Sequence, residues 1–265
     1  MAYGWSVLQW NDRLSQALRT DSGRPAVTWY ARDGERIELS RATLDNWATK
    51  TANLLIDDAD ASPGTQIALE IPLHWRTVCW ALGIWRTGAC IVTTPVTSTV
   101  TPVAPSKTPA SAAPPPAATM PPGPRVLVTT NPTAGADVDL QIAVALPPLA
   151  RCFDGPLHGA LDSAATVGAQ PDWLGPVVPP EACDLALADG TTTVSYEKFT
   201  TRPPGAPRRV LRTADPTAPV RLADLLALDV LADGGSLVLV TTDHPAAPQG
   251  SARDHLVATE RITHT

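Results

Sequence analysis

The hydrophobic positions near the start of the chain alternate between a helical spacing and short strand-like runs. An amphipathic helix is predicted over residues 3–20 by apolar side chains near the helical period, namely Trp5, Leu8, Leu14 and Leu18. Residues 25–39 then read as two strand-like runs around Asp33-Gly34, a dipeptide that favours tight turns. This part therefore predicts a helix followed by a β-hairpin.

The next sixty residues continue the alternation of helix and strand. Ser40 suits the N-cap of a helix over residues 40–58, because its hydroxyl can accept a bond from a first-turn amide. A buried strand is predicted over 65–71, a second helix over 74–89 and a further strand over 90–96. Helices and strands that take turns in this way indicate βαβ units on a largely parallel sheet.

The later part of the chain resumes the same pattern. Strands are predicted over 124–130, from 140 onward, over 208–214 and over 236–242, and helices over 158–169, 222–233 and 252–262. The five-residue spacing of Trp75, Trp80 and Trp85 does not follow one helical face, so burial of two of them is expected.

Composition changes sharply between these two parts. Residues 95–124 contain ten prolines among alanine, threonine and serine, with Lys107 as the only charged side chain. Such a segment buries too little apolar surface to offset the entropy of ordering, which predicts a flexible linker or surface insertion. We therefore divide the chain into a first α/β part (1–94), the insertion (95–124) and a second α/β part (125–265).

Charge and composition narrow the classes of function. The chain carries 44% hydrophobic residues and a net charge of −6, which argues against broad contacts to nucleic acid. No secretory signal opens the sequence, and the most apolar stretch, residues 79–92, is too short to span a bilayer. A cytoplasmic protein without a membrane partner is expected. The scattered cysteines are expected to be reduced and mostly buried, with no metal site; they are Cys79, Cys90, Cys152 and Cys183.

Several ordered stretches carry a family resemblance. They read RPAV (24–27), IELSRATL (37–44), SPGTQIALEIP (62–72), RTGACIVTTP (86–95), LLALDVLADGGSLVLVTTDHP (225–245) and ATERIT (258–263). In this order they resemble the opening portion of adenylate-forming enzymes: acyl-CoA synthetases, luciferases and peptide-synthetase adenylation domains. Short, uncharacterised proteins that carry only this amino-terminal portion are the most similar. The resemblance implies an α/β fold with mixed or parallel sheets flanked by helices, and it indicates fold more than function.

The family resemblance also directs attention to residues 186–199. In those enzymes a loop rich in Ser, Thr and Gly, ending in Pro-Lys-Gly, lies over the phosphates of ATP. The candidate cofactor-binding residues in this segment are Gly190, Thr191, Thr192, Thr193 and Lys198, although Lys198 comes two residues later than the family's lysine. Asp189, however, places negative charge where phosphates would lie, and Thr193, Ser195 and Tyr196 replace the family's glycine, proline and lysine.

Three interpretations of this segment follow. A plain hairpin turning at Asp189-Gly190 is favoured by the flanking β-branched residues. A degenerate phosphate loop at the same position in the fold and a working phosphate loop are the alternatives. Ser195 and Lys198 also fit an S-x-x-K pattern, but that motif needs a helix start where the pattern here indicates a strand. We expect no catalytic residue and no cofactor, with ATP or AMP as the candidate if the loop still binds one.

The sequence therefore leans away from an enzyme. The family's later adenine, ribose and catalytic-lysine motifs are not found within the 265 residues. The leading hypothesis is a catalytically incomplete protein that binds a nucleotide, an acyl group or a protein. The alternatives are an acyl-CoA ligase fragment completed by a partner chain, and a structural or interaction module. A sheet that ended at the last strand would leave that strand as an open edge, which predicts self-association or a partner that covers it.

Overall fold

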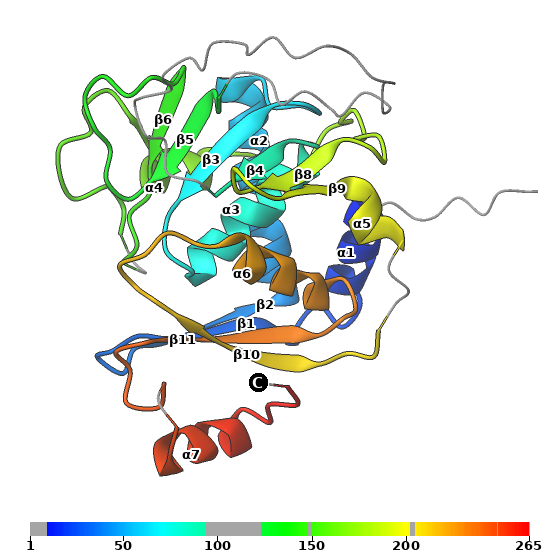
Figure 1. Ribbon diagram of the computed structural model, residues 1–265, viewed down its shortest axis with the longest axis vertical. Helices are drawn as coiled ribbons and strands as arrows, with labels where there is room; N and C mark the ends of the chain where they lie inside the picture. The colour runs from blue at the N-terminus through cyan, green and yellow to red at the C-terminus, as the bar shows by residue number, and fades with distance from the viewer. Residues whose placement is uncertain (1–9, 94–122, 148–149, 202–204, 248, 265) are drawn as a thin grey trace, which may run out of the picture.

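Two β-sheets with helices between and around them form the structure (Figure 1). It is a computed structural model that describes residues 10–93, 123–147, 150–201, 205–247 and 249–264. The carboxyl ends of the parallel strands in both sheets point to the same side of the molecule, on the left in Figure 1. This shared direction is what brings loops from the two sheets together.

The smaller sheet has four strands in the order β10-β11-β1-β2. The pairs β10–β11 and β11–β1 are parallel, whereas β1 and β2 form the antiparallel hairpin predicted around Asp33-Gly34. Gly34 has a φ of +85°, which the turn requires and glycine permits. The strands are β1 (Pro25–Tyr30), β2 (Arg36–Ser40), β10 (Arg209–Ala214) and β11 (Ser236–Thr241).

The larger sheet has seven strands in the order β7-β6-β5-β3-β4-β8-β9, and every pair except β8–β9 is parallel. Each sheet takes strands from before and after the proline-rich insertion (95–124). Residues 95–122 of that insertion lie outside the described residues. The strands are β3 (Gln66–Glu70), β4 (Cys90–Val92), β5 (Val126–Thr129), β6 (Leu140–Ala143), β7 (Leu161–Asp162), β8 (Leu185–Ala188) and β9 (Thr193–Ser195).

Helices fill the space between the sheets and cover their outer faces. In Figure 1, α3 and α6 lie between the two sheets, and α7 lies on the far side of the smaller one. Ser40 caps α2 as predicted, because its hydroxyl accepts a bond from the Thr43 amide at 3.1 Å. The helices are α1 (Trp10–Arg19), α2 (Arg41–Ala59), α3 (Trp75–Arg86), α4 (Ser163–Thr166), α5 (Tyr196–Thr201), α6 (Leu222–Leu226) and α7 (Ser251–Thr259).

The most buried helix is α3, and the burial expected for two of its tryptophans extends to all three. Trp75, Trp80 and Trp85 are all no more than 4% exposed, because the helix is covered on every side rather than along one face. The indole of Trp85 also donates a hydrogen bond to the Ala186 carbonyl at 3.0 Å, which ties α3 to β8. A five-residue spacing therefore gave no guide to burial in a helix enclosed by two layers.

Other elements differ from the sequence-based expectation. The helix predicted over 158–169 is the short strand β7, the single turn α4 and a 3-10 turn, Val167–Ala169. The helix predicted over 222–233 changes after Leu226 into a 3-10 helix, Ala227–Leu231. Helix α5 was not predicted, since the β-branched run before it obscured a helix start.

The expectation that the last strand lies at an open edge was also wrong. Strand β11 pairs with β10 on one side and β1 on the other, so it lies inside the sheet. The edge strands of this sheet are β10 and β2. The first residues of β10 are bridged by the end of the chain, where the amide of Leu211 donates to the His264 carbonyl at 3.0 Å. Whether the protein self-associates or binds a partner stays a prediction.

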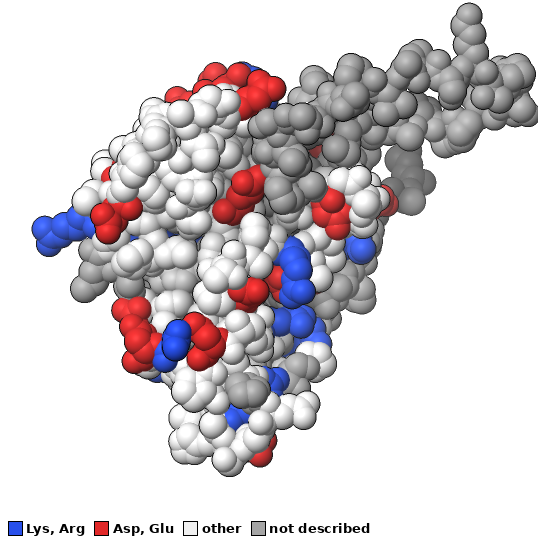
Figure 2. All heavy atoms as spheres, turned by 60° about the vertical axis from the view of Figure 1, so that its left-hand side comes forward, with Lys and Arg blue, Asp and Glu red and all other residues white. Residues whose placement is uncertain are grey.

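The structure also bears on the expected burial of the cysteines and on the expected lack of a membrane partner. Cys79 and Cys90 are buried as predicted, but Cys152 and Cys183 are exposed because both lie in loops. Within the described ranges, no helix combines the length and apolar character needed to cross a membrane. On the face shown in Figure 2, a basic side chain lies between acidic ones at the lower left, and other charged side chains are scattered over uncharged surface.

Candidate functional site

The segment that resembles a phosphate loop is a hairpin, as the sequence favoured. Strands β8 and β9 pair antiparallel on either side of a turn at residues 189–192, in which Gly190 has a φ of +82°. The amide of Asp189 donates to the Thr192 carbonyl at 3.1 Å and closes the turn. The Asp189 carboxylate accepts bonds from the amides of Thr191 at 3.1 Å and Thr192 at 2.7 Å.

The backbone amides of Thr191 and Thr192, which could otherwise donate to a phosphate, already donate to the Asp189 carboxylate. Hydrogen bonds from the backbone of Thr192 and Thr191 lower the pKa of Asp189, so it is ionised at neutral pH and repels an added anion. Thr193 and Lys198 are exposed, the first on β9 and the second on α5. Binding of a nucleotide by the five candidate residues stays a prediction, and the turn's own carboxylate weighs against it.

The residues that follow the hairpin hold it in place. Helix α5 begins at Tyr196, so the helix start thought to be missing from the S-x-x-K pattern is present. Tyr196 is 2% exposed, and its hydroxyl donates to the Ala89 carbonyl at 2.9 Å. A tyrosine stands where the family has lysine, and here it anchors the hairpin to the loop between α3 and β4.

A cavity of about 760 Å³ lies elsewhere, at the carboxyl ends of strands from both sheets. Its walls come from five separate segments: the end of β1 with the turn after it, and the carboxyl ends of, or loops after, β3, β6, β10 and β11. Ligands in open α/β sheets bind at such carboxyl ends, outside the strands. The apolar part of the wall includes Leu73, Leu146 and Pro147.

Two aromatic residues in the cavity wall carry buried polar atoms without a partner. Trp29 and His74 pack edge to face with ring centroids 4.4 Å apart. Within the described part of the chain, neither Trp29 Nε1 nor His74 Nε2 has a hydrogen-bond partner. Buried donors are rarely left unsatisfied in proteins, so the pair is unusual.

The protonation state of His74 follows from its place at the start of α3. Its Nδ1 accepts a bond from the Arg76 amide at 3.2 Å and caps the helix, so the proton of the neutral ring is on Nε2. Burial, with a smaller contribution from Arg76, lowers the pKa of His74 to about 3. At neutral pH the wall therefore contains two N–H donors, Trp29 Nε1 and His74 Nε2.

The remaining polar groups lie at the end of β11 and around the rim. Thr241 is 5% exposed, and its hydroxyl also lacks a partner among the described residues. The rim carries one basic side chain, Arg32, and three acidic ones, Asp33, Glu35 and Asp243. The cavity thus combines an apolar wall, unpaired donors and an acidic mouth.

Comparison with known proteins gives a family and a fold. The chain is 33% identical over 265 residues to a TIGR03089 family protein of Mycobacterium tuberculosis strain H37Rv, with 94% of each chain covered. The chain belongs to the TIGR03089 family. No family model matches the sequence. The name of this family states no activity.

Solved structures confirm the predicted fold of adenylate-forming enzymes. An acyl-CoA synthetase of Brucella canis superposes with a TM-score of 0.63 at 16% identity, covering 96% of this chain and 46% of that enzyme. The amino-terminal subdomain of Klebsiella oxytoca NpsA, in complex with 3-hydroxybenzoyl-AMSN, gives 0.59 at 14% identity, covering 99% of this chain and 61% of that one. This chain therefore spans less than half the length of the synthetase.

In the TIGR03089 chain a second, polar hollow adjoins the 760 Å³ cavity. It measures about 420 Å³, shares Pro72 and Pro216 with the larger cavity and includes Thr129, Asn131 and Asp137. Thr129 is the last residue of β5, and Asn131 and Asp137 lie in the loop between β5 and β6. The two spaces therefore share part of their walls.

Sequence reasoning did not find this site. Trp29 reads as an ordinary core residue of a strand, and His74 reads as the first residue of a helix. The one local signal was a histidine at an N-cap position, where Ser, Thr, Asp and Asn are preferred. The wall residues come from segments spread between Trp29 and Asp243, so no motif joins them.

Proposed function

We propose that this protein binds a neutral acyl compound in the 760 Å³ cavity. The observation that carries the proposal is the pair of buried N–H donors, Trp29 Nε1 and His74 Nε2, in a wall that also contains apolar residues such as Leu146. A carbonyl oxygen accepts both kinds of donor, and the apolar wall suits the alkyl or aryl body attached to it.

The acidic rim favours an uncharged carbonyl over a free carboxylate. Asp33, Glu35 and Asp243 outnumber Arg32 around the mouth, so an anion meets net repulsion as it enters. The neutral His74 adds no positive charge to offset this repulsion at pH 7. An amide, ester or thioester keeps the acceptor oxygen without the charge.

Replacing either donor should weaken binding without disturbing the fold. Trp29→Phe removes the indole N–H but keeps an aromatic ring, and His74→Asn removes Nε2–H while asparagine still caps α3. We expect the parent protein to bind benzamide more tightly than benzoate, and each variant to bind benzamide about tenfold more weakly, the equivalent of one neutral hydrogen bond of about 1.4 kcal/mol. Isothermal titration measures both.

The matched control for this experiment is Trp173→Phe. Trp173 is 69% exposed and lies outside the cavity wall, so its variant should bind like the parent protein. Binding of AMP without binding of benzamide would contradict the proposal. So would equal benzamide affinity in the parent protein and in Trp29→Phe and His74→Asn.

Catalytic incompleteness is the second part of the proposed function. The Asp189 carboxylate holds the amides of Thr191 and Thr192, which supports a turn that does not bind phosphates. We therefore expect no acid-dependent ATP–pyrophosphate exchange by this chain alone, measured with labelled pyrophosphate and a panel of carboxylic acids. Exchange that disappears in Lys198→Ala would show that the hairpin still works as a phosphate loop and would overturn this part.

A further inference from the structure

A separate cavity of about 430 Å³ lies at the opposite end of the four-stranded sheet from the 760 Å³ cavity, which is called the acyl cavity below. Its walls come from the amino ends of β1, β10 and β11, the turn at Gly234-Gly235 and the segment that follows α7. Because these strands are parallel, their amino ends lie side by side at the same end of the sheet. The two cavities share no residue.

Arginine is the most frequent residue in the wall of this 430 Å³ cavity. The chain as a whole has a net charge of −6, yet five arginines and only two glutamates line this space. Such a local excess of positive charge attracts anions into a cleft. The arginines are Arg24, Arg41, Arg208, Arg209 and Arg261.

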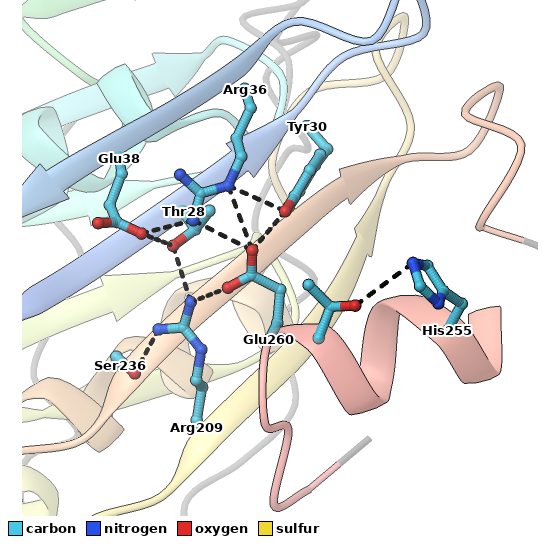
Figure 3. A network of polar contacts seen from close by, with 9 residues as sticks. Thr28, Tyr30, Arg36, Glu38, Arg209, Ser236, His255 and Glu260 are labelled. Carbon is cyan, nitrogen blue, oxygen red and sulfur yellow. Dashed lines mark hydrogen bonds and ion pairs between the residues drawn. The ribbon is translucent and has the colours of Figure 1, made fainter. Parts of the chain in front are cut away.

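The two glutamates are already engaged in a network with other partners (Figure 3). Glu260 binds Arg209 and Arg36, and Glu38 binds Arg36 at 2.6 Å. Arg24 has only a loose, exposed pair with Asp21 at 3.9 Å. The positive charge of the other arginines is therefore not neutralised by the carboxylates of the wall.

Arg41 is the most buried of these cations, at 6% exposure. Its Nη1 donates to the carbonyls of Ala17 at 3.2 Å and Thr20 at 2.6 Å, and its Nη2 donates to the Gly234 carbonyl. It makes no ion pair with the described residues. Burial and, to a lesser degree, repulsion from Arg24 lower the pKa of Arg41. A buried cation without a counter-ion is costly, and an anion in the cavity would relieve that cost.

We propose that the 430 Å³ cavity binds the phosphoryl group of a small soluble molecule. Guanidinium groups present paired N–H donors that match the oxygens of phosphate, and a group with two or more negative charges suits an excess of three positive ones. Arg208 and Arg261 are exposed and form no ion pair within the described residues, so they are the first contacts for an incoming anion. Hydroxyl groups of Ser236, Thr259 and Thr263 complete the wall.

The test uses inorganic pyrophosphate and isothermal titration at low salt, where ionic contacts are least screened. We expect the parent protein to bind pyrophosphate and the double variant Arg208→Ala/Arg261→Ala to bind it at least tenfold more weakly. Arg212→Ala is the matched control, because Arg212 is an exposed arginine of β10 outside this cavity. Arg41 is left intact, since its removal would leave three carbonyl groups without their donor.

Three results would overturn the proposal: no binding of millimolar pyrophosphate by the parent protein, equal binding by the double variant, or co-sedimentation with phosphatidic acid vesicles without pyrophosphate binding. The benzamide titration of the same double variant keeps the two sites apart. Loss of pyrophosphate binding with intact benzamide binding is the expected outcome. Failure of benzamide binding alone would count against the acyl cavity and leave the phosphoryl site supported.

Discussion

The variant Glu260→Gln is expected to lower the free energy of unfolding by about 3 kcal/mol at pH 7, the loss typical of breaking a buried ion pair on one side. Glu260 is 8% exposed and follows directly after α7. Its carboxylate accepts bonds from the Tyr30 hydroxyl and from Arg36 and Arg209 (Figure 3). The variant removes the negative charge that Arg209, whose side chain is 16% exposed, shares with the more exposed Arg36.

This effect should depend on pH in a defined direction. Burial alone would raise the pKa of Glu260, but hydrogen bonds from Tyr30, Arg209 and Arg36 outweigh it and hold the pKa below its ordinary value of 4.5. A lowered pKa in the folded state means that the carboxylate contributes its full stability above about pH 4.5. The contribution is lost as the pH falls through the lowered pKa, so the difference between parent and variant should shrink on acidification.

Urea denaturation at several pH values measures both the size and the pH dependence of this effect. Glu38→Gln is the matched control, because Glu38 also pairs with Arg36 but its side chain is 34% exposed. We expect that control to cost less than about 1 kcal/mol, as exposed ion pairs do. Equal losses in the two variants would contradict a special role for the buried carboxylate.

Replacing Gly235 with alanine is expected to cost about 3 kcal/mol by overpacking. A methyl group at this position would lie 2.3 Å from the Arg208 carbonyl oxygen and 2.6 Å from Val230 Cγ2. The nearest obstacle is backbone, and that carbonyl also accepts a bond from the Ser236 amide at 2.8 Å. The turn therefore cannot move aside without breaking the start of the β10–β11 pairing.

The control for this variant is Gly23→Ala. A methyl group added at Gly23 meets nothing within 4 Å, and we expect a change within about 0.5 kcal/mol. Thermal and urea unfolding of the two alanine variants give the comparison. A loss in Gly235→Ala no larger than in Gly23→Ala would show that the approach of Arg208 to this turn is not a tight constraint.

Turns and caps were predicted correctly where the deciding contacts lie within a few residues. The hairpins at Asp33-Gly34 and Asp189-Gly190 and the Ser40 cap each depend on a local hydrogen bond and on backbone preferences that a short window contains. The prediction of one continuous helix over 222–233 was wrong because it used only such local information. Its apolar spacing is helical, but packing between the two sheets tightens its second half into a 3-10 helix.

The sequence by itself determined the alternation of strands and helices, the fold class and the ordinary turn at residues 186–199, because apolar periodicity and turn preferences act over short stretches. Only the tertiary structure decided that β11 lies inside its sheet, that Trp29, His74 and Thr241 meet at one cavity, and that five arginines gather at the other end. Those arrangements depend on contacts between segments far apart in the chain. A linear pattern does not encode which distant strand becomes the neighbour, since that choice minimises exposed apolar surface over the whole molecule.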